Sequence, residues 1–219
     1  FFGNYALVSR SPPRYTLLPY TTLFRYRAME IKDATKENAS DLAHLINLAG
    51  EGIPAYLWHS MAEEGQDPMD YGEVRASREE GGFSYRNARV CVEDAQVQGM
   101  IISYKQPDIY STEDIDDYPD IVKPLILLES KAPGSWYINA IATFERYQGL
   151  GIARMLLNEA EERAVSEGVA EMSLIVASEN TRAKGLYEYL GYQPISSLPV
   201  VTYPGCLHGG EWLLMTKTL

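Results

Sequence analysis

The spacing of apolar residues predicts short strands and amphipathic helices from Met29 onward. The strand-like segment "MEIKDA" comes first, and leucine, isoleucine and alanine at helical spacing then predict a helix over 36–49, which Thr35 is suited to cap. Pro54 fits the first turn of a second helix. A third and more polar helix is expected over 68–80.

The middle of the chain is richer in β-branched and aromatic residues, which favour strands. The run "ARVCVEDAQVQGMIISYKQ" predicts a hairpin that turns at Glu93–Gln96. Residues 107–135 begin as an acidic loop that contains prolines, and they continue into an expected helix around "IVKPLILLES". The segment "WYINAIATF" predicts the next strand.

The last third of the chain predicts two further helices among three strands. The longer helix runs from about Leu150 to Glu167, and Gly168 suits its end. The strand "EMSLIVA" and the helix "ENTRAKGLYEYLGY", closed by Gly191, come next. Tyr192 begins another strand region, and "EWLLMTKTL" is the last strand. Strands in mixed order with helices on both faces predict an α/β or α+β fold in one domain.

Residues 1–28 differ from the rest of the chain. They carry four arginines and no Asp or Glu, and neither helical nor strand periodicity persists in them. We expect them to be a non-native or disordered extension, with a native arm as the alternative. Residues 29–219 are then expected to form the single domain.

Composition and charge narrow the class of protein. Apolar residues make up 46% of the chain and charged residues 22%, which is ordinary for a globular domain. No run of 18 apolar residues occurs and the first residues follow no signal-peptide pattern, so we expect a soluble, cytoplasmic protein. The net charge of −11 argues against binding to nucleic acid or an anionic membrane. It suits a cationic amine partner, although most acidic surfaces only favour solubility.

Cysteine and histidine give no sign of a metal site. Cys91 and Cys206 are the only cysteines, and two thiols without metal-like neighbours make neither a zinc motif nor a disulfide framework. The three histidines, His44, His59 and His208, lie far apart and form no ligand spacing. We therefore expect no bound metal.

The segment "ERYQGLGIARMLLNEAEERA" joins an expected strand to the long helix and carries two nearby glycines. It is not a P-loop, because no Lys and no Ser or Thr stand where that loop needs them. It is not a dinucleotide-binding fingerprint either, because Arg154 occupies the place of the third glycine. The first amides of a helix lack internal partners and attract anions, and Gly149 and Gly151 would let a diphosphate approach them. A turn with flexible glycines and no ligand is the alternative.

The pattern Gln148-x-x-Gly151-x-Ala153 resembles the acetyl-CoA motif of the GNAT acetyltransferase family. A second resemblance lies in "SENTRAKGLYEYLGY", which is similar to that family's closing helix. The order of elements agrees over 29–219, and the specific likeness covers about 136–192. The resemblance implies a mixed, mostly antiparallel central sheet with one splayed parallel pair of strands and helices on both faces.

The resemblance also implies how acetyl-CoA is held. Backbone groups of the strand "YINAIATF" would pair with the pantetheine arm, and amides of the glycine segment would bind the pyrophosphate. Gln148 stands where the family more often has Arg, and Arg146 and Arg154 are candidates to restore that charge. The expected cofactor-binding residues are Ile141, Ala142, Thr143, Gln148, Gly149, Leu150, Gly151, Ile152, Ala153 and Asn180.

The implied reaction is direct transfer of an acetyl group from acetyl-CoA to a primary amine of a small molecule or protein. Tyr187 matches the family tyrosine that protonates the departing thiolate, and a packed helix aromatic is its alternative role. The residues leave the base open, with Glu129, Glu145, His59 or Asn139 through a water as candidates. The aromatic residues that could line the acceptor pocket are Tyr56, Trp58, Tyr71, Tyr110 and Trp136.

The sequence therefore leaves three hypotheses about function. The first is the N-acetyltransferase, the second a noncatalytic acyl-CoA-binding sensor or interaction module on the same scaffold, and the third a structural domain without a CoA site. The sequence leaves the identity of the acceptor open. It also leaves the oligomeric state open, with a homodimer as one alternative.

Overall fold

The computed structural model describes residues 29–219, which form one seven-stranded sheet flanked by helices. The expectation about residues 1–28 falls outside the described part of the chain. The strands are β1 (Glu30–Asp33), β2 (Ala88–Glu93), β3 (Gln96–Lys105), β4 (Trp136–Thr143), β5 (Glu171–Ala177), β6 (Gln193–Pro199) and β7 (Glu211–Thr218). The α-helices are α1 (Ala39–Ala49), α2 (Ile53–Met61), α3 (Pro68–Ala76), α4 (Lys123–Glu129), α5 (Ile152–Ser166) and α6 (Thr181–Tyr189).

The sheet has the order β1-β2-β3-β4-β5-β7-β6. All neighbouring strands are antiparallel except β4 and β5, which are parallel. The fold is therefore the mixed, mostly antiparallel sheet with one parallel pair that the family resemblance implies. The predicted hairpin is confirmed, and its turn residues Asp94 and Ala95 both have positive φ, at 49° and 64°. Such a two-residue turn matches the twist of the flanking strands.

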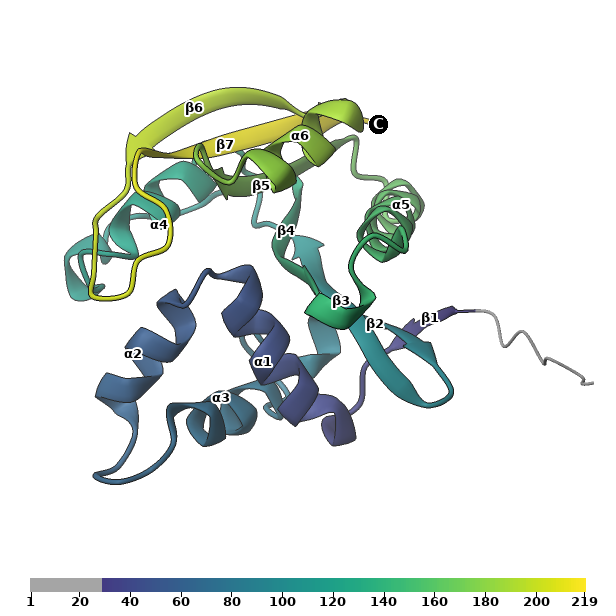
Figure 1. Cartoon of the computed structure of the whole chain (residues 1–219). Helices are drawn as coiled ribbons and strands as arrows, with labels where there is room; N and C mark the ends of the chain where they lie inside the picture. The colour runs from purple at the N-terminus through teal and green to yellow at the C-terminus, as the bar shows by residue number, and fades with distance from the viewer. Residues whose placement is uncertain (1–28) are drawn as a thin grey trace, which may run out of the picture.

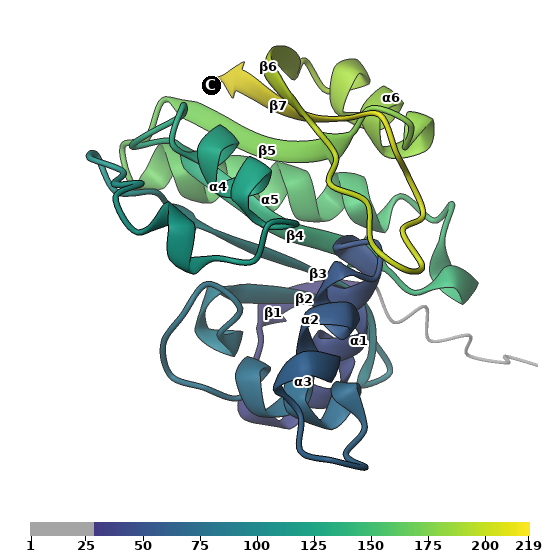
Figure 2. The ribbon, with the colours of Figure 1, turned by 90° about the vertical axis from the view of Figure 1, so that its left-hand side faces the viewer.

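Helices cover both faces of the sheet. Helices α1, α2 and α3 lie on one face beside β1–β4, and α5 lies on the opposite face (Figure 1). Viewed from the side, the loop between β6 and β7 descends toward α1 and α2 (Figure 2). Two of the three apolar cores follow this layering. Leu42, Ile46 and Ile102 belong to the core under α1, whereas Leu156 and Met172 belong to the core under α5.

The parallel pair separates along its length. Only three residue pairs join β4 to β5, and the last of them is Ile138 with Leu174. On its other side β4 stays paired with β3 up to Thr143, and β5 stays paired with β7 up to Ala177. The remaining residues of β4 and β5 therefore face each other without a ladder of hydrogen bonds. This opening is the splay that the family resemblance implies.

The predicted helices are all present, but several boundaries differ. The segment 36–49 begins with a 3₁₀ turn at Lys36–Asn38 before α1, and the amide of Thr35 donates to Oδ1 of Asn38 at 2.9 Å. Helix α3 ends at Ala76 instead of near 80. Helix α5 begins at Ile152 instead of Leu150, because Gly149 and Gly151 both have φ of 82° and cannot continue a right-handed helix.

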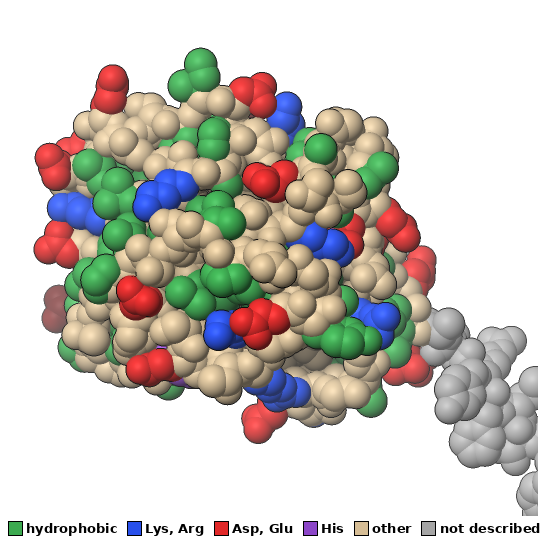
Figure 3. Space-filling view, turned by 90° about the horizontal axis from the view of Figure 1, so that it is seen from above, with side chains coloured by type: hydrophobic (Ala, Val, Ile, Leu, Met, Phe, Trp, Pro, Cys, Tyr) green, Lys and Arg blue, Asp and Glu red, His purple; other side chains and the backbone are tan. Residues whose placement is uncertain are grey.

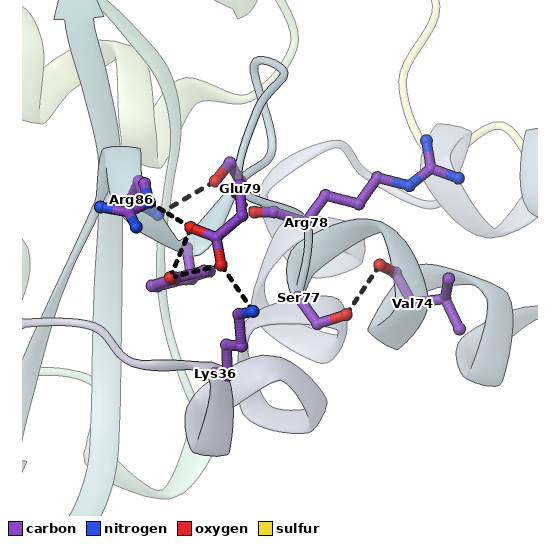
Figure 4. Close-up of polar contacts among 8 residues, drawn as sticks. Lys36, Val74, Ser77, Arg78, Glu79 and Arg86 are labelled. Atoms are coloured by element: carbon purple, nitrogen blue, oxygen red, sulfur yellow. Dashed lines mark hydrogen bonds and ion pairs between the residues drawn. The ribbon is translucent and has the colours of Figure 1, made fainter.

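A cluster of charges ties the start of α1 to the loop after α3. Glu79 accepts hydrogen bonds from Tyr85, and its carboxylate forms ion pairs with Lys36 at 2.5 Å and with Arg86 at 2.5 Å (Figure 4). These donors hold the pKa of Glu79 down at about 2. The side chains of Lys36, Glu79 and Arg86 are all exposed, so their ion pairs order the surface and add little to stability.

The surface formed by β6, β7 and α6 carries acidic, basic and apolar side chains interspersed with one another (Figure 3). Among residues 29–219, no helix is long and apolar enough to cross a membrane. No group of three or more His, Cys, Asp or Glu side chains within the same range could hold a metal ion.

Candidate functional site

A cleft of about 620 Å³ opens where β4 and β5 separate. Its walls come from the end of β4, the start of α5, the end of β5 and the start of α6, together with the turn after α1. The residues that line it are Leu48, Ala49, Glu51, Ile141, Ala142, Thr143, Tyr147, Gln148, Gly149, Gly151, Ile152, Ala153, Arg154, Ile175, Val176, Ala177, Asn180, Arg182, Ala183, Leu186, Tyr187, Tyr189 and Trp212. Of the residues expected at the acetyl-CoA site, Leu150 alone does not line the cleft; its side chain is exposed.

One wall of the cleft is the free edge of β4. Ile141, Ala142 and Thr143 lie beyond the last pair with β5, so this stretch has no neighbouring strand on the β5 side. An extended chain can add to such an edge through main-chain hydrogen bonds. The edge therefore suits a ligand that contains amide groups.

The floor at one end is the N-terminus of α5. The first main-chain hydrogen bond of this helix runs from the amide of Met155 to the carbonyl of Gly151, at 3.0 Å. Within residues 29–219, the amides from Gly149 to Arg154 donate to no other group. No atom lies within 4 Å of the position that a Cβ would take at Gly149 or Gly151. Unpaired amides with open space in front of them fit a diphosphate.

Two side chains bring further hydrogen-bonding groups to this end of the cleft. Gln148 accepts a hydrogen bond from a guanidinium nitrogen of Arg182 at 2.6 Å, and its own amide donates to the carbonyl of Thr143 at 3.4 Å. Arg182 belongs to the first turn of α6, so the contact joins the turn before α5 to α6. Arg154 also lines the cleft and lies over the ring of Tyr189, 5.8 Å from its centroid.

Of the arginines considered from the sequence, Arg146 does not line the cleft. It lies over the rings of Phe144 and Tyr147, at 5.8 and 4.9 Å from their centroids. Arg182 was missed, because only the folding of α6 against α5 brings it to Gln148, 34 residues away in the chain.

Helix α6 places two of the predicted residues on the cleft. Asn180 caps the helix, since its Oδ1 accepts from the amide of Ala183 at 3.1 Å. Tyr187 lies further along the same helix. It is 8% exposed, and its ring centroid lies 6.0 Å from that of Tyr192. Its hydroxyl has no hydrogen-bond partner among the described residues. Burial and, to a smaller extent, the charge of Glu51 raise the pKa of Tyr187 to about 12, so the phenol keeps its proton at neutral pH.

Glu51 is a cleft residue that the sequence did not single out. It lies in the turn between α1 and α2, its side chain is 11% exposed, and its backbone has a left-handed φ of 54°. Its carboxylate oxygens contact Asn180 and His208. The only local signal is an acidic residue placed before Gly52 and Pro54 at a helix boundary.

The four candidate bases from the sequence lie elsewhere, since none of them lines the cleft. Glu145 and His59 are exposed on the surface. Asn139 donates to the carbonyl of Gly82 at 3.3 Å. Glu129 accepts hydrogen bonds from the hydroxyls of Tyr110 and Tyr137, at 2.7 and 2.9 Å, and desolvation raises its pKa.

The aromatic residues expected around an acceptor also lie outside the cleft lining. Trp58 and Trp136 are buried in the two cores, at 3% and 5% exposure. Tyr71 packs against the core under α1, and Tyr56 packs on Tyr203 with 5.1 Å between ring centroids. The aromatic side chain that the cleft does contain from β7 is Trp212, which the sequence did not indicate.

Chemically, the cleft combines an anion-binding helix terminus, a free strand edge, a protonated phenol and a carboxylate. These groups lie along one elongated opening. They suit a ligand with a diphosphate at one end and amide groups in its middle, and they place proton-transferring groups next to it.

A comparison with protein families matches residues 53–192 to the acetyltransferase (GNAT) family. The match runs from α2 through the end of α6 and contains most of the residues that line the cleft. It includes the glycine segment and Tyr187.

Solved structures with the same fold include three acetyltransferases. An N-acetyltransferase from Staphylococcus aureus Mu50 has a TM-score of 0.58 at 21% identity, over 86% of this chain and 100% of that one. A second structure, described as an acetyltransferase, has a TM-score of 0.60 at 21% identity over 86% and 98%. A Drosophila melanogaster polyamine N acetyltransferase, described as catalysing the formation of N-acetylagmatine, has a TM-score of 0.62 at 12% identity over 88% and 100%. At these identities the likeness shows the fold alone.

Proposed function

Because the chain belongs to the acetyltransferase (GNAT) family, we propose that it is an N-acetyltransferase that moves an acetyl group from acetyl-CoA to a primary amine of a small molecule or protein. One observation carries the proposal. The unpaired amides at the start of α5 and the free edge of β4 open into the same cleft. The cytoplasmic location expected from the sequence is part of this proposal.

In this proposal the chain holds acetyl-CoA along the cleft. The amides from Gly149 to Ala153 bind the diphosphate, and Arg182 adds a positive charge beside Gln148. The main chain of Ile141 and Thr143 pairs with the amides of the pantetheine arm. When bound, acetyl-CoA supplies a thioester whose acetyl carbon is open to attack by an amine nitrogen.

Tyr187 is the proposed acid. Its hydroxyl has no hydrogen-bond partner among the described residues, and its raised pKa keeps the proton on the phenolic oxygen at neutral pH. A free thiol has a pKa near 8.5, so a thiolate is a weaker base than this phenolate, and transfer of the proton requires the sulfur to be close and the attacking nitrogen to return a proton to the phenol. The buried position of Tyr187 in the cleft supports that proximity.

A primary amine is the proposed acceptor on two grounds. The chain has a net charge of −11, which favours the approach of cations. Two of the similar structures, an agmatine N-acetyltransferase and the polyamine enzyme, are named for amine acetylation. The alternative is a noncatalytic sensor that binds an acyl-CoA in the same cleft.

Replacement of Tyr187 with Phe distinguishes the N-acetyltransferase hypothesis from the noncatalytic sensor hypothesis. We expect Tyr187→Phe to lower kcat by about 100-fold or more, because general acid catalysis contributes on that scale, and to change CoA affinity little. Release of CoA over a panel of amines and calorimetric titration with CoA measure the two effects. The matched control is Tyr118→Phe, an exposed tyrosine outside the cleft lining, which should leave both values unchanged. Full activity in Tyr187→Phe would remove this tyrosine from the mechanism.

A third reading, a domain without a CoA site, is tested by thermal unfolding. A ligand that binds the folded state raises its stability by mass action. We therefore expect millimolar CoA to raise the Tm of the wild-type protein. An unchanged Tm at that concentration would reject CoA binding and the proposed function with it.

A further inference from the structure

The turn between α1 and α2 carries an unusual carboxylate. Glu51 adopts a left-handed backbone with φ of 54°, a conformation that glycine and asparagine adopt far more readily. Gly52 follows with φ of 92°, so two successive residues have positive φ. This backbone turns the side chain of Glu51 inward, where it is 11% exposed and lines the cleft.

Three separate parts of the chain hold Glu51 in place. The amide nitrogen of the Asn180 side chain donates to Oε1 at 2.8 Å, and Nδ1 of His208 lies 2.7 Å from Oε2. The hydroxyl of Tyr203 donates to the main-chain carbonyl of Glu51 at 2.8 Å. Asn180 caps α6, whereas Tyr203 and His208 belong to the loop between β6 and β7. The carboxylate is thus fixed relative to the helix that carries Tyr187.

Glu51 and Tyr187 line the same cleft, and the charge of Glu51 acts on the phenol of Tyr187. The proposed acid must reach the sulfur of the thioester, and the attacking amine must reach the carbon bonded to that sulfur. A group that takes the proton of the amine therefore has to lie close to the acid. Among the cleft-lining residues in the described range 29–219, Glu51 is the only carboxylate.

We propose that Glu51 binds the acceptor amine as its ammonium ion and takes up the proton that this ion must lose, an inference that rests on the proposed N-acetyltransferase function. An ammonium group would donate to the carboxylate in a charge-assisted hydrogen bond. Asn180 and His208 act as positioning residues, because they orient the carboxylate and do not meet the amine themselves.

Protons and electrons balance in the proposed step. The ammonium ion gives one proton to Glu51, which passes it to water, and the freed lone pair forms the C–N bond while the C–S electrons leave with sulfur. Tyr187 gives its proton to sulfur, and the second proton lost by nitrogen restores the phenol. The net change is one amide and one thiol formed and one proton released.

Other titratable groups lie around Glu51 on two elements. From the loop between β6 and β7, Nδ1 of His208 contacts the carboxylate and the hydroxyl of Tyr203 donates to the main-chain carbonyl of Glu51, and Tyr187 of α6 lines the same cleft. An alkyl amine such as the lysine side chain has a pKa near 10.4. A comparison between pH 7.5 and pH 10 therefore changes the protonation of the acceptor amine.

The test compares Glu51→Gln with wild type and with Glu179→Gln. Glu179 lies near the same loop, where its carboxylate accepts from the amide of Gly209 at 2.9 Å, but it does not line the cleft. The acceptor panel is agmatine, putrescine, benzylamine and a lysine-containing peptide. The readouts are kcat/KM at pH 7.5 and pH 10, calorimetric affinity for CoA, and the binding of the best acceptor to the CoA-bound protein, which cannot react.

We expect Glu51→Gln to lower kcat/KM at pH 7.5 by about 100-fold or more, and the deficit to shrink at pH 10, where the free amine needs no base. Acceptor affinity in the CoA complex should fall at least tenfold, with CoA affinity unchanged. Glu179→Gln should match wild type in every readout. Glu51→Asp, which keeps the charge, should recover part of both losses.

Two results would contradict the role of Glu51 without contradicting the proposed N-acetyltransferase function. One is wild-type turnover in Glu51→Gln. The other is an equal loss of CoA affinity and turnover at both pH values in Glu51→Gln and Glu51→Asp, which would indicate a structural role. If wild type itself neither binds CoA nor acetylates any acceptor of the panel, the proposed function fails, and the role of Glu51 fails with it.

Discussion

At the scale of single residues, Arg182 brings a positive charge from another helix to the glycine segment. Gln148 is neutral, but its side-chain oxygen accepts from Arg182 at 2.6 Å, so a guanidinium lies beside the unpaired amides at this end of the cleft. Gln148 also donates to the carbonyl of Thr143, which fixes its orientation. The neutral side chain of Gln148 thereby positions the charged side chain of Arg182.

Loss of this cation should weaken CoA binding. We expect Arg182→Gln to lower CoA affinity about tenfold or more, because hydrogen bonds to charged groups contribute about 1.5–3 kcal/mol. The loss should shrink at high salt, since screening already weakens the attraction in wild type. Calorimetric titration at two salt concentrations measures both effects. Arg146→Gln is the control, because Arg146 lies over Phe144 and Tyr147 outside the cleft lining. Equal losses in the two variants would show only a general charge effect.

The same scale shows what a sequence can and cannot indicate about a site. Gln148, Gly151 and Tyr187 were predicted because they belong to short local patterns next to a strand or within a helix. Glu51 and Arg182 were not, since their place depends on contacts with residues 129 and 34 positions away. The aromatic candidates lie outside the cleft for a related reason, because Trp58 and Trp136 are buried in the cores.

At the scale of elements, the start of α5 depends on two glycines that hold left-handed backbone. Gly151 has φ of 82° and precedes the first helical residue, and open space surrounds the position of a Cβ. Gly168 after the same helix has φ of 71° and equally open surroundings. Both glycines therefore hold a left-handed backbone, but only Gly151 lines the cleft.

Alanine substitutions at Gly151 and Gly168 should distinguish the effect of backbone strain on stability from the effect of the added methyl group on CoA binding. We expect Gly151→Ala and Gly168→Ala each to lower the free energy of unfolding by about 1 kcal/mol, the scale of left-handed backbone for a residue with a Cβ. Gly151→Ala should also weaken CoA binding about tenfold, because the methyl group points into the space before the unpaired amides. Denaturant unfolding and CoA titration give the two values. Unchanged CoA affinity in Gly151→Ala would contradict a diphosphate at this helix terminus.

Most elements could be predicted from the sequence because their apolar spacing is regular. The strand "EMSLIVA" and the helix that Pro54 begins are found as expected. Boundaries were less predictable, because α5 starts only after Gly151 and a 3₁₀ turn precedes α1. The separation of β4 from β5 has no local signal either, since both strands are mostly apolar along their whole length. It was expected only through the family resemblance.

At the scale of the whole molecule, the sheet consists of two parts joined weakly. Strands β1–β4 form one part and β5–β7 the other, and only three residue pairs connect them. The remaining contacts across the cleft come from side chains, including Glu51 with Asn180 and Gln148 with Arg182. A ligand lying between the two parts would therefore add main-chain contacts where the sheet itself has none.

Hydrogen exchange of the backbone tests this description. Without ligand, amides on the free edge of β4 between 139 and 143 should exchange faster than those of β3, which has a partner strand on each side. With CoA at 100 times its Kd, the folded state gains about 2.7 kcal/mol, and protection should rise both at this edge and at the first amides of α5. Protection limited to α5 would leave the helix terminus as the whole site. Full protection of 139–143 without ligand would mean that β4 and β5 are paired in solution, which leaves no room for the pantetheine arm and contradicts the proposed mode of binding.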